Sequence, residues 1–454
     1  MPAREFDYVS DKTTPLKGVD KSTLLNLLWG DRVEVLEDGD PWVKVRARGR
    51  DTVGWVKKTA LGGEPLLEVY FIDVGQGDGI LIKTPGKKHL MVDGGNLRKA
   101  QNPRKNAADF VDWKFFHDYG EDKIELEAVI ASHCDVDHYG GLTDLLAVDK
   151  NDELDCKEVR VETIYHAGLG YWSTGDGEKT LGPTEPKDGK RFFRQLVGNR
   201  EEVEAALQPD AEPALAGEWA KFMQAAADTL NAGGDPAAIE RLSDRTEHLN
   251  GFGPGVDGEV AIKVLGPLEF EVEVGGKTLH ARQEYDGEAG ISTNGNSVLL
   301  RLDYNGCRIL LTGDLNTESQ EALLEFYEGK AGELACDVAK ACHHGSEDVS
   351  IPFLQALEPA ATVISSGDNE GHDHPRPKVI SASALTGYRH PEDGKTLESP
   401  LIFSTELSRS VKLGPPVELV YGLVNVRTDG KEILFATRDE HTRRWRTDKV
   451  DSRF

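Results

Sequence analysis

Short stretches of alternating apolar and polar residues fill the first 62 residues of the chain. Val33 and Val35 alternate with polar residues before a turn at Asp38-Gly39, and residues 41–58 contain two similar stretches. Period-two alternation between turn residues is typical of β-strands that are buried on one face. Several strands without a long helix between them predict a small all-β barrel over residues 1–62.

A second pattern follows the linker at residues 61–66 and continues to the C-terminus. It consists of continuous apolar runs, which predict buried strands, and several of these runs end in a His or an Asp. Residues 66–454 are therefore predicted to form one α/β domain. An insertion at about residues 168–260 interrupts it, and we predict that this insertion is mostly helical. Helical spacing is clearest at Trp219, Phe222, Met223, Ala226 and Leu230.

Charge and composition make some classes of function less probable for this chain. The 454 residues include 53 Lys and Arg against 79 Asp and Glu, a net charge of −26. This balance disfavours a general coat for duplex DNA, because such affinity comes from cations that neutralise phosphates. No apolar run approaches 18 residues and no signal peptide is visible, so we expect no membrane association. The five cysteines lack CxxC spacing, which predicts a reducing, cytoplasmic location without disulfides.

The strongest chemical signal is the segment SHCDVDHYGG. It places His133, Asp135, Asp137 and His138 in one loop directly after a predicted strand. A turn brings these alternating side chains to one point, and two imidazoles with two carboxylates suit one or two divalent ions. We therefore predict a metal site at this loop.

Other predicted strands end in groups of the same kind. They are Asp93 in MVDGGN, Asp314 in LLTGD, His343 and His344 in KACHHGS, and His372 and His374 in GHDHPRP. The loop FIDVGQGD contributes Gln76 and Asp78, which either form part of a glycine-rich turn or contact the metals or the substrate. Loops at strand ends are common positions for functional groups, so these segments are expected to meet.

Together these motifs resemble the metallo-β-lactamase superfamily, whose second motif is HxHxDH. The variant HxDxDH found here is similar to that of the soluble catalytic domain of ComEC-type competence proteins. The resemblance implies an αββα sandwich with a dinuclear metal site. Residues 1–62 in turn resemble a bacterial Src-homology-3-like module, through Gly30-Asp31, Trp42 to Val45 and Gly54 to Val56. Its tryptophans either fill the barrel core or line a groove for a peptide, protein or glycan.

The resemblance also implies roles for individual residues. His133 and Asp135 would hold one ion, Asp137 and His138 the other, and Asp314 would bridge the two. One of His343 and His344 would complete the second site, and Asp93 would orient the ligands. The third-motif histidine of the superfamily is replaced here by a segment containing Asn296 and Ser297, which are expected near the metals or the substrate. The cofactors are thus expected to be two divalent ions, Zn²⁺ or Mn²⁺.

The implied chemistry is hydrolysis by a metal-activated hydroxide. Asp137 is the candidate acceptor of the water's proton, His374 a candidate donor to the leaving oxygen, and Asp78 a third candidate catalytic residue. The preferred substrate is a phosphodiester in nucleic acid, either a single strand or an end. Two alternatives remain open: a small ester, lactone or phosphoester as substrate, or a binding module with a vestigial metal site.

Two basic clusters support the nucleic-acid hypothesis. One contains Arg98, Lys99, Arg104 and Lys105, and the other contains Lys190, Arg191 and Arg194 at the start of the insertion. Cations interleaved with aromatic residues suit a single strand, although a solvated helix start explains each cluster equally well. We further predict that the insertion forms a helical lid over the metals, with Lys190, Arg191 and Arg194 facing the cleft.

Overall fold

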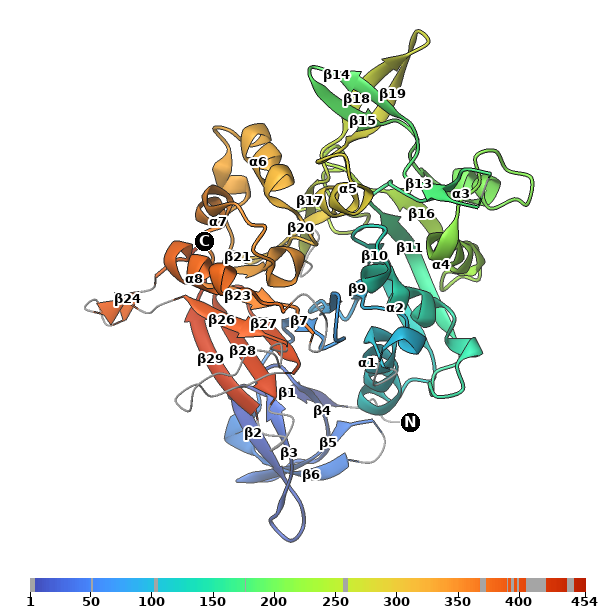
Figure 1. Cartoon of the computed structure of the whole chain (residues 1–454). Helices are drawn as coiled ribbons and strands as arrows, with labels where there is room; N and C mark the ends of the chain where they lie inside the picture. The colour runs from blue at the N-terminus through green and yellow to red at the C-terminus, as the bar shows by residue number, and fades with distance from the viewer. Residues whose placement is uncertain are drawn as a thin grey trace.

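Two β-sheets packed face to face, with helices on both outer sides, form the body of the protein (Figure 1). The structure is a computed structural model. It describes residues 5–49, 52–101, 105–175, 177–255, 260–367, 373–389, 391–392, 396–397, 400–405, 422–438 and 445–454.

The first sheet has nine strands, in the order β16-β11-β10-β9-β8-β7-β27-β28-β29. Its strands β9, β10, β11 and β16 run parallel to one another, and the others pair antiparallel. The bounds are β7 Leu67–Phe71, β8 Gly79–Lys83, β9 His89–Gly94, β10 Ile124–Ala131, β11 Val159–His166, β16 Ala238–Arg241, β27 Val424–Thr428, β28 Glu432–Arg438 and β29 Trp445–Asp451.

The second sheet has six strands, in the order β17-β20-β21-β22-β23-β26. Strands β21, β22, β23 and β26 are parallel, so their carboxyl ends lie at the same edge. The bounds are β17 Ala261–Gly266, β20 Leu299–Tyr304, β21 Cys307–Leu311, β22 Val338–Lys340, β23 Ala361–Ile364 and β26 Leu401–Ser404.

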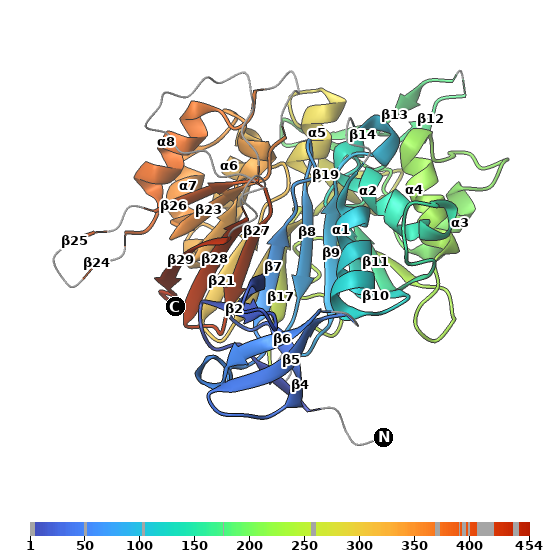
Figure 2. The ribbon, with the colours of Figure 1, turned by 90° about the horizontal axis from the view of Figure 1, so that it is seen from below.

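Helices cover the outer face of each sheet. Helices α1, α2, α3 and α4 lie on the nine-stranded sheet, and α6, α7 and α8 lie on the six-stranded sheet. Helix α5 lies at the edge where the two sheets meet (Figure 2). The bounds are α1 Ala107–Trp113, α2 Val136–Leu146, α3 Arg200–Ala206, α4 Gly217–Asp228, α5 Ala289–Gly295, α6 Thr317–Phe326, α7 Ile351–Leu357 and α8 Pro377–Thr386, and the π-helix η3 spans Lys114–Tyr119.

The apolar pattern of the strands explains the layers. In β7, Leu67, Val69 and Phe71 enter the core between the sheets, where they meet residues such as Val298. Tyr70 points to the opposite face and joins the helical side of the core. Burial on both faces is what continuous apolar runs require, and the predicted αββα sandwich is confirmed.

The N-terminal residues form a separate antiparallel sheet, which we call the N-terminal unit (residues 5–61). Its strands are β1 Phe6–Tyr8, β2 Thr13–Lys17, β3 Thr23–Leu28, β4 Arg32–Glu37, β5 Trp42–Arg48 and β6 Thr52–Lys57. It lies below the sandwich in Figures 1 and 2 and has its own small core around Val33, Val43 and Val45. The predicted all-β character is confirmed, whereas the resemblance to a Src-homology-3-like module and a ligand for that module stay predictions.

The expectation of a mostly helical insertion is wrong for its first part. Residues 168–260 contain α3 and α4, but also the short strands β12 Trp172–Ser173, β13 Lys179–Thr180, β14 Thr184–Lys187 and β15 Lys190–Phe193. Strands β14 and β15 join β18 Phe270–Val274 and β19 Lys277–Gln283 in a four-stranded sheet. Phe192 and Phe193 are buried in two different clusters, which requires the alternation of a strand.

The prediction that the apolar stripe forms a lid over the metals is also wrong. Trp219, Phe222, Met223 and Ala226 are buried on α4, as their spacing predicts. Their partner is α2, since the Tyr139 ring lies 5.1 Å from Trp219 and 5.5 Å from Phe222. Helix α4 is therefore part of the outer helical layer, because α2 already offers it an apolar face.

Two further expectations can be compared with the fold. No helix within the described ranges is both long enough and apolar enough to cross a membrane. All five cysteines are buried and free.

Candidate metal centre

Four buried side chains meet where the two sheets adjoin. Asp78 precedes β8, His138 lies in the first turn of α2, Asp314 follows β21, and His344 follows β22. One ligand atom from each lies within 4.8 Å of the others. Both sheets contribute, so the site is assembled only when the sandwich is closed.

His138 is oriented by a carboxylate behind it. Its Nδ1 lies 2.8 Å from Asp93 Oδ2, so Nδ1–H donates to Asp93. The other ring nitrogen, Nε2, then carries the lone pair and lies 3.2 Å from Asp314 Oδ2. This carboxylate–histidine order is the one that metal-binding histidines use.

His344 repeats the arrangement from the other sheet. Its Nδ1 lies 3.2 Å from the Ser365 carbonyl and 3.3 Å from Asp78 Oδ1, and both of these oxygens are acceptors. Its Nε2 lies 2.9 Å from Asp314 Oδ2 and 3.3 Å from His138 Nε2. Two imidazole lone pairs and a carboxylate oxygen thus converge, and only a proton or a metal cation can occupy such a point favourably.

His133 marks a second position beside the first. The Ser132 hydroxyl donates to Asp93 Oδ2 at 2.6 Å, so at 3.0 Å it accepts from His133 Nδ1–H. His133 Nε2 is therefore left with a lone pair; it is buried, has no hydrogen-bond partner, and lies 3.8 Å from Asp135 Oδ2. A buried acceptor without a donor is costly, and a second cation would remove that cost.

Neighbouring charges and burial set the protonation of the site. Burial disfavours the charged form of His344, but Asp314 and Asp78 outweigh it and raise the pKa of His344 to about 9. Asp314 and Asp93 likewise raise the pKa of His138 against its burial. Burial and the neighbouring Asp137 raise the pKa of Asp135 to about 6. Protons hold the positions that metal ions would take, so metal binding should release protons.

Sequence reasoning did not identify Lys340 as a site residue. This lysine ends β22 and is fully buried; its Nζ contacts Asp78, lies 3.3 Å from Asp314 Oδ1, and donates to the Gly313 carbonyl at 2.8 Å. Because Lys340 faces Oδ1 of Asp314, the other oxygen, Oδ2, is the one that faces the two histidines. A lysine within the apolar run DVAKAC is the signal that could have revealed it, because buried lysines require paired charges.

Glycines allow the motif loop to approach its neighbours. A Cβ on Gly77 would lie 1.8 Å from the Asp137 carbonyl oxygen, and one on Gly141 would lie 1.8 Å from the Gly94 carbonyl oxygen. Gly77 also has φ +109°, which other residues rarely adopt. Gly77 therefore allows the loop before β8 to approach the start of α2, and Gly141 allows α2 to approach the end of β9.

The structure also places the remaining predicted site residues. His344, rather than His343, belongs to the four-residue cluster; His343 Nε2 lies 4.0 Å from Asp314 Oδ2 and is partly exposed. His374 is buried beside this pair, with its ring 5.9 Å from that of His343. Gln76 donates to Asp137 Oδ2 at 3.4 Å. His372 lies outside the described residues.

The replaced third-motif segment divides into two roles. Ser297 accepts from the Asp314 amide at 3.0 Å, and its hydroxyl lies 3.2 Å from His133 Nδ1. Asn296 instead donates to the carbonyls of Gln283 and Ser292, so it fixes the end of α5 rather than reaching the site. Thr293 of α5 donates to Asp135 Oδ2 at 2.9 Å.

The basic clusters make internal ion pairs. Arg98 is buried and pairs with Asp109 and Glu153, so it is not available to a phosphate, and Arg104 lies outside the described residues. Arg191 pairs with Glu284, and Arg194 pairs with Glu185. Lys190, Arg191 and Arg194 lie on or next to β15 of the four-stranded sheet, not on a helical lid. Their expected position facing the cleft is not borne out by these contacts.

Taken together, the donors fit divalent cations. His138, His344 and Asp314 face one point, and His133 and Asp135 face a second. Asp137 Oδ2 lies 3.8 Å from His344 Nε2, on the partly exposed side of the cluster. Asp78 and Asp93 lie behind the histidines, near Nδ1 of His344 and of His138.

Comparison with known proteins supports this assignment. Residues 72–245 match the Metallo-beta-lactamase superfamily. A stretch of 90 residues, 20% of the chain, is 33% identical to ComE operon protein 3 of Bacillus subtilis (strain 168). A stretch of the same length is 39% identical to competence protein ComA of Neisseria gonorrhoeae. These matches cover only 11% and 13% of the two relatives.

A solved structure described as a metal-dependent hydrolase of the beta-lactamase superfamily also aligns with the chain. The alignment covers 74% of this chain and 95% of that one, at 11% identity and a TM-score of 0.34. The similarity to known proteins therefore rests on the family match and on the two partial relatives.

Proposed function

We propose that this chain, a metal-dependent hydrolase of the metallo-β-lactamase superfamily, cleaves phosphodiester bonds in nucleic acid, at single strands or at ends. The observation that carries the proposal is the convergence of His138 Nε2 and His344 Nε2 on Asp314 Oδ2, beside the unpartnered His133 Nε2. The names of the two partial relatives, both competence proteins, favour nucleic acid as the substrate.

The ligand set favours two divalent ions with some hard character. Imidazoles come from His133, His138 and His344, and carboxylates come from Asp135, Asp137 and Asp314. A mixture of nitrogen and oxygen donors suits Zn²⁺ or Mn²⁺, and Asp135 in the position of a histidine tilts the choice toward Mn²⁺.

The chain's own residues supply orientation and proton transfer. Ions bound at these positions would lower the pKa of a water and neutralise phosphate oxygens. Asp137 is partly exposed, and Gln76 donates to it, so its carboxylate is placed to accept a proton from the attacking water. His374, beside His343, is placed to protonate the leaving oxygen. Asp78 orients His344 instead of acting on the substrate.

The experiment that tests this function combines metal analysis with a substrate panel. Purified protein would be assayed with Mn²⁺ or Zn²⁺ on single-stranded DNA, duplex DNA, RNA, bis-p-nitrophenyl phosphate and a lactone. We expect cleavage of single-stranded nucleic acid and of the model phosphodiester, and no cleavage after chelation. Hydrolysis of the lactone alone would instead support a small-ester hydrolase, and protein without bound metal or activity would indicate a vestigial site.

A further inference from the structure

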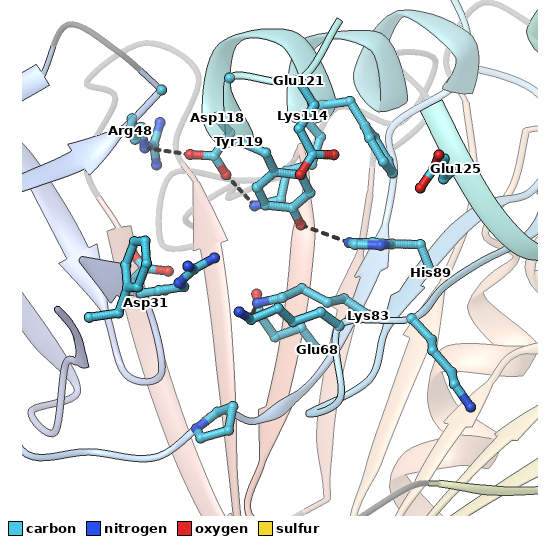
Figure 3. A pocket seen from close by; sticks show the side chains of 18 of the residues that line it. Asp31, Arg48, Glu68, Lys83, His89, Lys114, Asp118, Tyr119, Glu121 and Glu125 are labelled. Carbon is cyan, nitrogen blue, oxygen red and sulfur yellow. Dashed lines mark hydrogen bonds and ion pairs between the residues drawn. The ribbon is translucent and has the colours of Figure 1, made fainter. Parts of the chain in front are cut away.

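A large cavity separates the N-terminal unit from the sandwich, at the far end of the strands that lead to the metal centre. It encloses about 570 Å³ and is lined by residues of β4, β5, β7, β8, β9 and η3 (Figure 3). We call it the junction cavity. Pockets for small molecules commonly have this volume and lie between domains.

The lining of the junction cavity is unusually basic for this protein. Acidic residues outnumber basic ones by 79 to 53 in the whole chain, but the two kinds line the cavity in equal number. The basic residues are Arg32, Arg46, Arg48, Lys83, Lys87, Lys88, Lys114 and Arg160.

The inner acidic residues are already neutralised by protein cations. Glu68, which is buried, pairs with Lys83 and with Arg427. Asp118 pairs with Lys114 and, at 3.3 Å, with Arg48, as the dashed lines in Figure 3 show. These acids therefore cannot neutralise further cations at the cavity wall.

Two cations of the lining remain without such a partner. The half-buried Arg32 guanidinium lies 3.5 Å above the Phe6 ring and makes no ion pair with any residue that the structure describes. Its Nε is buried without a hydrogen-bond partner. Lys87, in the turn between β8 and β9, likewise has no ion pair within the described ranges. Glu121 also lines the cavity, and its carboxylate interacts electrostatically with both Arg32 and Lys87.

The pKa values of two lining residues, His89 and Lys87, are affected by the cations of the cavity. Burial, then Lys83 and Lys114, lower the pKa of His89 to about 3. Burial, then Arg32 and Lys83, lower the pKa of Lys87. In both groups burial is the larger cause, and the nearby cations lower the pKa further.

We propose that the junction cavity binds a small phosphate-bearing molecule, either free phosphate or a phosphomonoester. Arg32 from the N-terminal unit and Lys87 from the sandwich would hold the phosphate, because guanidinium and ammonium groups together match its charge and geometry. Phe6, Phe115 and Tyr119 line the same space and offer contacts to an organic body.

This site is separate from the metal centre. His89 and Asp93 lie at opposite ends of β9, which places them roughly 13 Å apart along the strand. A ligand here would contact both the N-terminal unit and the sandwich, and would tie the two together without touching the proposed catalytic residues.

Isothermal titration of the metal-free full chain tests the proposal. The probes are inorganic phosphate, a nucleoside 5′-monophosphate, the matching nucleoside and succinate. We expect saturable binding of the two phosphate-bearing probes and none of the nucleoside or of succinate. Tighter binding of the monophosphate than of phosphate would show that the organic body is also recognised, whereas equal affinity would assign the site to the phosphate group alone.

Variants locate the binding. Arg32→Gln with Lys87→Gln should weaken phosphate binding at least tenfold, whereas Lys12→Gln with Lys57→Gln, which removes equal charge from exposed positions of the N-terminal unit, should leave it unchanged. His138→Ala with Asp314→Ala should also leave it unchanged. Lys87→Gln alone, in an exposed turn, provides a second variant if the double one is unfolded by circular dichroism.

Several results would overturn the proposal. They are the absence of saturable binding, unchanged binding in both the Arg32/Lys87 and the Lys87 variants, and loss of binding in the His138/Asp314 variant, which would assign the phosphate to the metal centre. Binding of succinate or the nucleoside in place of phosphate would also contradict it.

Discussion

Strands β7, β8 and β9 connect two regions that handle buried charge in opposite ways. At the end near the N-terminal unit, Glu68 meets Lys83 and Arg427, so the chain supplies its own counter-charges. At the other end, His133, His138 and His344 face one another and the carboxylates, and Lys340 pairs with Asp78 and Asp314. A buried charge that is paired within the protein stabilises the fold. A buried nitrogen lone pair without a donor, such as that of His133 Nε2, instead favours binding of a cation.

The difference also explains why the metal centre is identifiable from contacts alone. Hydrogen bonds behind the histidines fix each Nδ1 as a donor, through Asp93 for His138 and through Ser132 for His133. The Nε2 atoms consequently point into the site: those of His138 and His344 face Asp314, and that of His133 has no hydrogen-bond partner. The carboxylate of Glu68, in contrast, already faces Lys83 and Arg427.

The largest effect is expected for the metal ligands. Replacing His133 and Asp137 by Ala should lower hydrolysis by at least about 1,000-fold, because both positions that face the substrate lose a ligand. The melt followed by circular dichroism should hardly change. A matched control is His117→Ala with Asp155→Ala, an exposed pair 3.0 Å apart, which should keep full activity. Normal turnover of the His133/Asp137 variant would contradict the metal-centre assignment.

The buried cations Lys340 and Arg427 should differ in whether a metal ion can restore the stability that is lost when they are replaced. Lys340→Met and Arg427→Met should each lower the free energy of unfolding by about 3–5 kcal/mol, because each leaves buried carboxylates unpaired. Saturating Mn²⁺ should recover stability in the Lys340 variant only, since a divalent ion can replace the lost charge there. Urea unfolding with and without Mn²⁺ measures this, and equal recovery in both variants would remove the distinction between the regions.

The orienting carboxylates should have a smaller effect. Asp93→Asn and Asp78→Asn should each weaken metal binding about 10–100-fold, the range for groups that orient histidine ligands. Asp118→Asn, whose carboxylate faces the junction cavity, should leave metal affinity unchanged. Competition with a chromogenic chelator measures the affinities, and an equal loss in all three would mean that general charge, not orientation, matters.

The smallest expected effect concerns pH. Burial lowers the pKa of His166 to about 3, below the ordinary value near 6.5, so the unfolded chain takes up its proton first. His166 therefore contributes full stability above pH 6.5 and loses it as the pH falls toward 3, by up to about 1.4 kcal/mol per pH unit. His166→Gln should unfold with a shallower pH dependence between pH 6 and 4. Identical slopes would show that His166 is protonated in the fold.

Sequence patterns predicted the parts of this protein that local rules determine. Continuous apolar runs identified strands such as β7, β10 and β21, and helical spacing identified α4. The motif loop identified His133 and His138, because a turn after a strand fixes where such side chains meet.

Properties set by distant contacts were not predictable. Lys340 appears in the sequence as one charge in an apolar run, and only the sandwich brings it to Asp78 and Asp314. The strands of the insertion form because Phe192 packs against Val272 and Ala281, which lie some 80 residues later. The position of Asn296 depended in the same way on the carbonyl of Gln283, at the end of β19.

The division of the metal ligands between the two sheets has a consequence for biosynthesis. Asp93, His133 and His138 are translated early, whereas Asp314 and His344 emerge only after most of the chain has left the ribosome. A nascent chain that ends before residue 314 lacks the oxygen on which both histidines converge, so firm metal capture requires that Asp314 and His344 have been synthesised. Translation products that end before residue 314 therefore lack part of the ligand set, and the order of the genetic message delays hydrolytic activity until strands of both sheets are present.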